Sequence, residues 1–398
     1  MSPWSRASQT LVRGARGRRR RVICSAAVGA VTVLWVATAA QAGPAGLGES
    51  LAVPHWRVVA TVKSALLSGL VAPSRHSVWA LGTGGAAGGQ GKAFPVGVHW
   101  NGRTWSKVSF PRAISKTGIG CAAASSARSV WAFAGTSTAG SSANAAGALR
   151  LVRGRWNLVK SFPPGIVTGC LVVDAKDVWV FGDAHVAPGT GTWHLHGHTW
   201  THLGFHGYLL GNASAISRND VWGAGSTSVL VPVVARWNGQ SWVRNKQLAG
   251  SLPKPGAHVE LSIDGITAIS DRNVWLRILV SQFSATRTDS FIVLHWTGRA
   301  WHRVGPSNGG YFLPGAVRGG DGTWWSFLQP DAFGRLPSGV RHLVGGHWVK
   351  VPVKIAGCMA DQPTLLAPAG SSSTMLGLQD CTSSSGIVAH VLARGTIR

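Results

Sequence analysis

Histidines cluster in the middle of the chain, where five occur within thirteen residues between positions 194 and 206. His194 and His196 are two residues apart, so in a β-strand their side chains share one face. His198 falls at the turn of a hairpin-like segment. Neutral imidazoles on one face can bind zinc or copper. His194, His196 and His198 are therefore the candidate metal ligands of the sequence.

A structural role for these histidines is the alternative interpretation. Similar hairpin-like segments elsewhere in the chain carry His99, His295 and His347 at similar places. A residue type that recurs with a repeated segment is typical of packing within that segment. We therefore expect no bound metal and no other cofactor.

Basic residues dominate the charge of the chain, which is +25 over its 398 residues. Residues 1–42 hold seven Arg and no acid, so the remainder keeps a charge of +18. Such a charge favours an anionic partner, although a compositional bias toward Arg is an equal alternative. The candidate ligand-binding residues are the Lys and Arg in or beside long, Gly-rich loops, namely Lys92, Lys116, Lys246, Lys254, Arg277, Arg287 and Arg335.

Cysteine spacing suggests disulfide bonds. Apart from Cys24, the chain has four cysteines, an even number that is typical of an exported protein. Cys121 and Cys170 precede two equivalent tryptophans by ten and nine residues, which predicts matching positions on neighbouring strands. Cys358 and Cys381 fall within the last repeat. We predict the pairs Cys121–Cys170 and Cys358–Cys381.

The elements that position these residues recur along the chain. A short apolar strand ending at Gly, at 77–82, precedes a hairpin-like segment at 99–105 with a Trp on each side of Asn101-Gly102. Asn-Gly predicts a tight primed turn. The strand marker repeats at Val78-Trp79, Val130-Trp131, Val178-Trp179, Val221-Trp222, Val274-Trp275 and Thr323-Trp324, with a degenerate copy at Thr374-Met375.

These markers recur at intervals of 43 to 53 residues, each interval holding four short strands. This period is typical of propeller blades. Residues 55–59 match the last strand of a blade, whereas residues 387–395 match a strand without the partner that should follow. We predict an all-β, monomeric, seven-bladed β-propeller over residues 55–398. Its four-stranded antiparallel blades form a ring closed by the N-terminal strand joining the last blade.

Two further strand features follow from the repeat. Small and β-branched residues precede each marker, as at 69–72 and 171–173, and are typical of strands around a central channel. Asp177, Asp220 and Asp271 lie just before the marker strands. We interpret them as turn residues that accept hydrogen bonds from nearby backbone N–H groups.

The N-terminus has the pattern of an export signal. An Arg cluster at 16–21 precedes an apolar run at 22–39 and the small residues of Ala40-Gln41-Ala42. We expect cleavage before Gly43, a short linker at 43–54 and a secreted domain. An uncleaved anchor over residues 22–42, with the domain outside, is the alternative.

The pairing of a [DN]-V-W-[A/G]-x-G strand with a W-[NT]-G-x-x-W hairpin resembles exported bacterial propeller proteins common in actinobacteria. These are related in architecture to kelch and galactose-oxidase-like propellers. The resemblance covers residues 55–398. It implies the fold and no particular function, because propellers host enzymes, lectins and scaffolds.

Propeller chemistries can be tested against the composition. A galactose-oxidase-like copper site needs a redox Tyr with a Cys partner, and the two tyrosines, Tyr208 and Tyr311, have no Cys nearby in sequence. Thirteen acidic residues, two of them Glu, leave little for paired-carboxylate catalysis. No catalytic residue is predicted.

We expect an exported, non-enzymatic binding propeller that recognises an anionic glycan, a wall polymer or a protein, rather than nucleic acid. The alternatives are a hydrolase or lyase with a site at the channel mouth, and a purely structural envelope protein.

Overall fold

The computed structural model describes fifteen stretches of the chain. These are residues 56–85, 92–135, 146–182, 190–203, 208–227, 231–253, 258–283, 287–304, 316–318, 323–328, 339–344, 347–353, 365–368, 374–383 and 386–394. The chain divides into two compact units, Met1–Ala52 and Val53–Arg398, and the described residues all belong to the second. The expected signal and linker lie outside them.

Seven four-stranded antiparallel sheets make up the second unit, which confirms the predicted number and composition of the blades. Sheet 1 comprises β2 (Ala65–Ser74), β3 (Ser77–Gly84), β4 (Phe94–Trp100) and β5 (Trp105–Lys107). Sheet 2 comprises β6 (Ile119–Ser126), β7 (Ser129–Ala134), β8 (Ala146–Val152) and β9 (Arg155–Phe162). Sheet 3 comprises β10 (Val167–Asp174), β11 (Asp177–Gly182), β12 (Trp193–His196) and β13 (Thr199–His202).

The remaining sheets repeat the same order. Sheet 4 comprises β14 (Tyr208–Ser217), β15 (Asp220–Thr227), β16 (Pro232–Trp237) and β17 (Trp242–Arg244). Sheet 5 comprises β18 (Val259–Ser270), β19 (Asn273–Phe283), β20 (Arg287–Trp296) and β21 (Trp301–Val304). Sheet 6 comprises β22 (Val317–Arg318), β23 (Trp324–Leu328), β24 (Gly339–Val344) and β25 (His347–Val351). Two 3-10 turns, η1 (Arg112–Ile114) and η2 (Lys246–Ser251), follow β5 and β17.

The seventh sheet joins the two ends of the unit. It comprises β26 (Leu365–Pro368), β27 (Met375–Ser383), β28 (Gly386–Arg394) and the N-terminal strand β1 (Trp56–Lys63). β1 pairs antiparallel with β28, from Trp56 opposite Arg394 to Lys63 opposite Val388. The prediction that the N-terminal strand completes the last sheet is confirmed. This pairing covers a strand edge that would otherwise be open to other chains.

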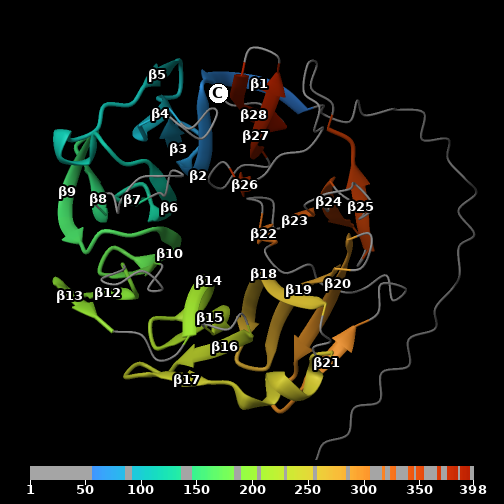
Figure 1. Ribbon diagram of the computed structural model, residues 1–398. Coiled ribbons are helices and arrows are strands. Elements are labelled where there is room, and N and C mark those ends of the chain that lie inside the picture. The colour runs from blue at the N-terminus through green and yellow to red at the C-terminus, as the bar shows by residue number, and fades with distance from the viewer. Residues whose placement is uncertain are drawn as a thin grey trace, which may run out of the picture. The chain divides into compact units, whose positions relative to one another are not determined.

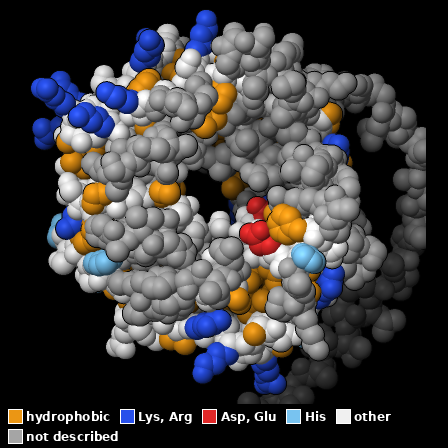
Figure 2. Space-filling model, viewed as in Figure 1, with side chains coloured by type: hydrophobic (Ala, Val, Ile, Leu, Met, Phe, Trp, Pro, Cys, Tyr) orange, Lys and Arg blue, Asp and Glu red, His pale blue; other side chains and the backbone are white. Residues whose placement is uncertain are grey.

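Within this unit, Figure 1 shows the sheets in chain order around a centre, with the first strand of each sheet on the inside. The first strands of consecutive sheets are in contact, as β2 with β6, β6 with β10, β10 with β14, and β14 with β18. Figure 2 shows an opening at the centre of the face in view. In the part of the chain that the structure describes, no helix is long and apolar enough to span a membrane.

A disulfide bond between Cys121 and Cys170 links two neighbouring first strands, β6 and β10, with Cα atoms 6.0 Å apart. This predicted pair is confirmed. Cys381 is buried and disulfide-bonded, but Cys358 lies outside the described residues, so the pair Cys358–Cys381 stays a prediction. By tethering two sheets, the Cys121–Cys170 bond restricts the unfolded chain, an effect worth about 4 kcal/mol for a loop of this length.

The turn chemistry differs from the sequence prediction. At the Asn101-Gly102 hairpin, Trp100 pairs with Trp105 across four residues, and only Gly102 has a positive φ, +94°. The side-chain oxygen of Asn101 accepts hydrogen bonds of 2.9 Å from the backbone N–H groups of Arg103 and Thr104. A two-residue turn with both φ angles positive occurs instead at Arg153-Gly154. Asn101 therefore shapes its turn through its side chain rather than its backbone.

Candidate functional site

A cleft between sheets 4 and 5, with a volume of about 940 Å³, combines positive charge with aromatic walls. We call it the 4/5 cleft. Among the described residues, its lining includes four cations and no carboxylate. It consists of Asn219, Trp222, Arg236, Asn238, Val243, Arg244, Asn245, Lys246, Gln247, Trp296, Gly298 and Arg299.

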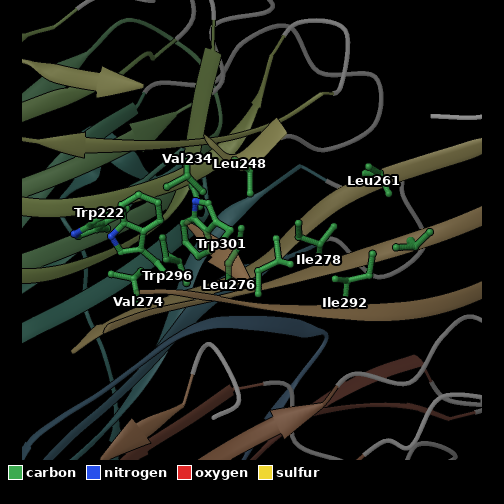
Figure 3. Close-up of a cluster of buried hydrophobic side chains, with 14 residues drawn as sticks. Trp222, Val234, Leu248, Leu261, Val274, Leu276, Ile278, Ile292, Trp296 and Trp301 are labelled. Atoms are coloured by element: carbon green, nitrogen blue, oxygen red, sulfur yellow. The ribbon is translucent and has the colours of Figure 1, made fainter. Parts of the chain in front are cut away.

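The floor of the 4/5 cleft is the hydrophobic core that sheets 4 and 5 share. Figure 3 shows Trp222 of β15, Trp296 of β20 and Trp301 of β21 gathered at one end of this core. The ring centroids of Trp222 and Trp296 are 5.9 Å apart, and those of Trp222 and Trp301 are 6.3 Å apart. Large aromatic side chains supply most of the buried area at such a junction, so the floor is rigid.

Arg236 forms one wall of the 4/5 cleft and is fixed by two contacts. Its guanidinium donates two hydrogen bonds of 2.7 Å to the carboxylate of Asp220, across the β15–β16 pair. It also lies over the Trp222 ring, 5.4 Å from the centroid. The hydrogen bonds that Arg236 donates to Asp220 raise the pKa of Arg236 above its ordinary value. Arg236 is therefore a permanently charged and oriented group.

Three exposed cations complete the cleft: Arg244 at the end of β17, Lys246 at the start of η2 and Arg299 in the β20–β21 turn. Arg236 already has a carboxylate partner, whereas no ion pair to a described residue involves these three. The turn that carries Arg299 depends on Gly298, whose φ of +93° disfavours other residues. The cleft thus presents three cations to solvent around an aromatic floor.

A second cleft, of about 730 Å³, lies at the matching place between sheets 1 and 2. We call it the 1/2 cleft. Trp79 and His99 are its equivalents of Trp222 and Arg236. In each sheet, the Trp on the second strand lies directly opposite its partner on the third strand. Its cations are Lys107 and Arg155. Burial lowers the pKa of His99, so this side chain is neutral near pH 7.

A tryptophan on the second strand stacks on a side chain of the third strand throughout sheets 1 to 6. The third-strand partner is His99, Arg150, His194, Arg236, His295 or His342. This register corrects two sequence interpretations. In sheet 6 the equivalent tryptophan is Trp325, not Trp324, and the equivalent histidine is His342, not His347.

Two of the three aspartates interpreted as turn residues, Asp177 and Asp220, instead begin strands β11 and β15, whereas Asp271 does lie in the turn before β19. Asp177 accepts the indole N–H of Trp179 at 3.1 Å and contacts His194, while Asp220 binds Arg236. The third, Asp271, is exposed and contributes its backbone carbonyl to the Trp296 indole. The backbone N–H groups of these turns donate instead to side chains at the end of the preceding strand. Asp174, for example, accepts a hydrogen bond from the N–H of Lys176 at 2.8 Å.

The basic residues predicted to bind a ligand do not form one group in the described structure. Lys92, Lys116 and Lys246 are exposed, and of these only Lys246 lines the 4/5 cleft. Arg277 was expected beside a loop, but it is buried inside β19 and forms an ion pair with Asp264. The backbone of Arg287 begins β20, whereas Lys254 and Arg335 lie outside the described residues. Their ligand-binding role stays a prediction.

Figure 2 shows how charge is distributed on one face of the unit. Most Lys and Arg side chains in view lie along the outer rim, and the acidic side chains lie beside the central opening. Sequence reasoning missed Arg236, Arg244 and Arg299, because none lies in a long loop. One sequence signal was available, since Arg236 precedes the Trp of its hairpin as His99 and His295 do in theirs.

Among the predicted metal ligands, His194 and His196 do share a face, as their spacing predicted. Both approach the buried Asp177, with His194 Nε2 at 3.2 Å from Oδ1 and His196 Nδ1 at 3.8 Å from Oδ2. His198 is exposed at the β12–β13 turn and does not belong to this group. The third member of the cluster is therefore Asp177 of the neighbouring strand.

No family model matches the chain, and no curated protein matches it. Several solved structures are similar at low identity. YCF48 from Cyanidioschyzon merolae is 12% identical with a TM-score of 0.49, over 84% of this chain and 98% of that one. A GH74 xyloglucanase from Xanthomonas campestris is 14% identical with a TM-score of 0.48, over 81% of this chain and 52% of that one. The six-bladed Aleuria aurantia lectin is 13% identical with a TM-score of 0.34, over 61% and 78%. At these values, the similarities carry no argument about function.

Proposed function

We propose that this chain is an exported, non-enzymatic binding protein, built as a closed seven-bladed propeller, that holds an anionic polysaccharide or wall polymer in the 4/5 cleft. The observation that carries the proposal is the combination of Arg244, Lys246 and Arg299 around an aromatic floor, with no carboxylate among the described residues of the lining. Guanidinium groups bind sulfate, carboxylate and phosphate oxygens in pairs of hydrogen bonds.

Two properties of the cleft favour a polymer over a small ligand. The cleft lies between two sheets, and its exposed cations come from both of them: Arg244 and Lys246 from the end of sheet 4, and Arg299 from the β20–β21 turn of sheet 5. Arg236 adds a fourth charge whose orientation does not change on binding, because Asp220 holds it at two atoms. Pre-orientation lowers the entropy lost when a ligand binds.

The test is retention of the purified protein on heparin and on an isolated anionic wall polymer across a salt series. The variant Arg244→Gln/Arg299→Gln removes two cleft charges, and Lys107→Gln/Arg155→Gln removes two from the 1/2 cleft as a matched control. We expect the first variant to bind at least roughly tenfold more weakly, since each charge-assisted hydrogen bond contributes roughly 1.5–3 kcal/mol. The control variant keeps most of the affinity.

Equal losses in the two variants would show that binding follows net charge and not the 4/5 cleft. Flow-through of the unaltered protein at low salt would exclude an anionic polymer. The remaining candidates would then be a protein partner, a hydrolase or lyase site at the channel mouth, or a structural envelope role.

A further inference from the structure

We propose that Asp177, His194 and His196 form a zinc site on the two central strands of sheet 3, where β11 begins and β12 ends. The three residues come from two adjacent strands, because Asp177 of β11 lies directly opposite His196 of β12. One ligand atom of each lies within 4.8 Å of those of the other two. The site is separate from the 4/5 cleft and independent of the polymer proposal.

The first argument is the state of the Asp177 carboxylate. Asp177 is 1% exposed, and its Oδ1 atom receives the Trp179 indole N–H and contacts His194 Nε2. Its Oδ2 atom is buried and accepts no hydrogen bond. Among the described residues, no Lys or Arg pairs with Asp177. A buried carboxylate without a cation is costly, so this oxygen favours a positive ligand.

Comparison among the sheets gives the second argument. At the place of Asp177, sheets 1, 2, 4, 5 and 6 have Ser77, Ser129, Asp220, Asn273 and Thr323. In sheet 5, Asn273 is enough to accept both the Trp275 indole and His295, at 2.7 and 3.0 Å. In sheet 4, the carboxylate of Asp220 is matched by Arg236. A neutral side chain is therefore enough to hold the stacked Trp and His rings. The packing of sheet 3 does not require the negative charge of Asp177.

Geometry supplies the third argument. In a tetrahedral zinc site with bonds of about 2.0–2.1 Å, neighbouring ligand atoms lie roughly 3.3 Å apart. His194 Nε2 is 3.2 Å from Oδ1 of Asp177, and His196 Nδ1 is 3.8 Å from Oδ2. Because the ligand atoms lie within 4.8 Å of one another, His196 must move closer to complete the site. The His194 ring is fixed by stacking on Trp179, with centroids 3.7 Å apart. The His196 side chain is 71% exposed and can adjust.

Ligand chemistry selects the metal. Two imidazoles and one carboxylate favour Zn²⁺ over Mg²⁺ or Ca²⁺, which prefer oxygen ligands. Each imidazole binds zinc through an unprotonated ring nitrogen, so a proton carried by that nitrogen is released to solvent when the metal binds. Because His196 faces solvent, the fourth ligand is water.

The test uses the purified protein after treatment with a chelator, titrated with ZnCl₂ by calorimetry and with Co²⁺ followed by visible absorption. We expect one tight Zn²⁺ site and the intense Co²⁺ bands of a tetrahedral centre. His196→Asn should weaken this site at least roughly tenfold without affecting the fold, since its side chain is exposed. Asp177→Asn should do the same while keeping the sheet intact, because Asn273 fills this role in sheet 5.

His198→Asn is the matched control, an exposed histidine two residues from His196 that should leave the affinity unchanged. The proposal is overturned if the unaltered protein binds Zn²⁺ no better than His196→Asn. It is also overturned if His198→Asn causes an equal loss.

Discussion

The 4/5 cleft and the 1/2 cleft are two versions of one structural site with different charge. Both lie between adjacent sheets, and both have a second-strand Trp stacked on a third-strand partner. In the 1/2 cleft the partner is His99, whose ring centroid is 3.6 Å from that of Trp79. In the 4/5 cleft it is Arg236, held by Asp220. The repeat therefore conserves packing within the chain while varying charge, and a binding site can arise without any change of backbone.

The largest expected effect comes from the second-strand tryptophan that the two clefts have in common. Trp222→Ala and Trp79→Ala should each destabilise the protein by about 3–5 kcal/mol, because each leaves a cavity where a buried indole packed. Urea unfolding measures both, and Val243→Ala, at an exposed place in the 4/5 cleft, is the control with a change below about 0.5 kcal/mol. If either tryptophan variant lost little unfolding free energy, the two clefts would not be structurally equivalent.

A smaller effect compares the first residue of the second strand in the two sheets, Asp220 in sheet 4 and Ser77 in sheet 1. Asp220→Asn should cost about 1–2 kcal/mol, because it weakens two charge-assisted hydrogen bonds to an arginine that solvent partly screens. Ser77→Ala in sheet 1 removes a hydrogen bond of 3.2 Å from the Trp79 indole and should cost about 0.5–1 kcal/mol. Urea unfolding of both variants at low and high salt gives the comparison. Only the Asp220 effect should shrink with salt, and equal salt dependence would contradict this difference in charge.

The smallest effect is a dependence on pH that distinguishes the 1/2 cleft from the 4/5 cleft. Burial lowers the pKa of His99, so the unfolded chain takes up this proton more readily than the folded protein. The stability contributed by neutral His99 is present above the unfolded pKa of about 6.5 and is lost as the pH falls below it. Arg236, with its raised pKa, stays charged over this range.

His99→Gln should therefore reduce the slope of unfolding free energy against pH between about pH 7 and pH 5. The exposed His198→Gln variant serves as the control and should keep the slope of the unaltered protein. An unchanged slope in His99→Gln would show that His99 does not carry this dependence.

The sheets could be predicted from the sequence because their signals are local. The Val-Trp strands and the turn glycines mark each strand pair, and the unpaired sequences at both ends indicate the β1–β28 pairing. Side-chain partners could not be predicted, because they depend on register. Arg277 is buried because a shift in register between Ile263 and Gly265 of β18 brings Asp264 beside it. Likewise, His196 meets Asp177 only because β11 and β12 align in that register.

The pairing of β1 with β28 also constrains the order of folding. Of the strands described, β1 is made first by the ribosome and β28 last, so the partner of β1 does not exist until all the other described strands have been made. The first six sheets each consist of strands that are consecutive in the chain and can form as soon as they are made. The seventh must instead close a loop of more than three hundred residues, which slows folding. Until then β1 is an unpaired strand that needs protection from other chains.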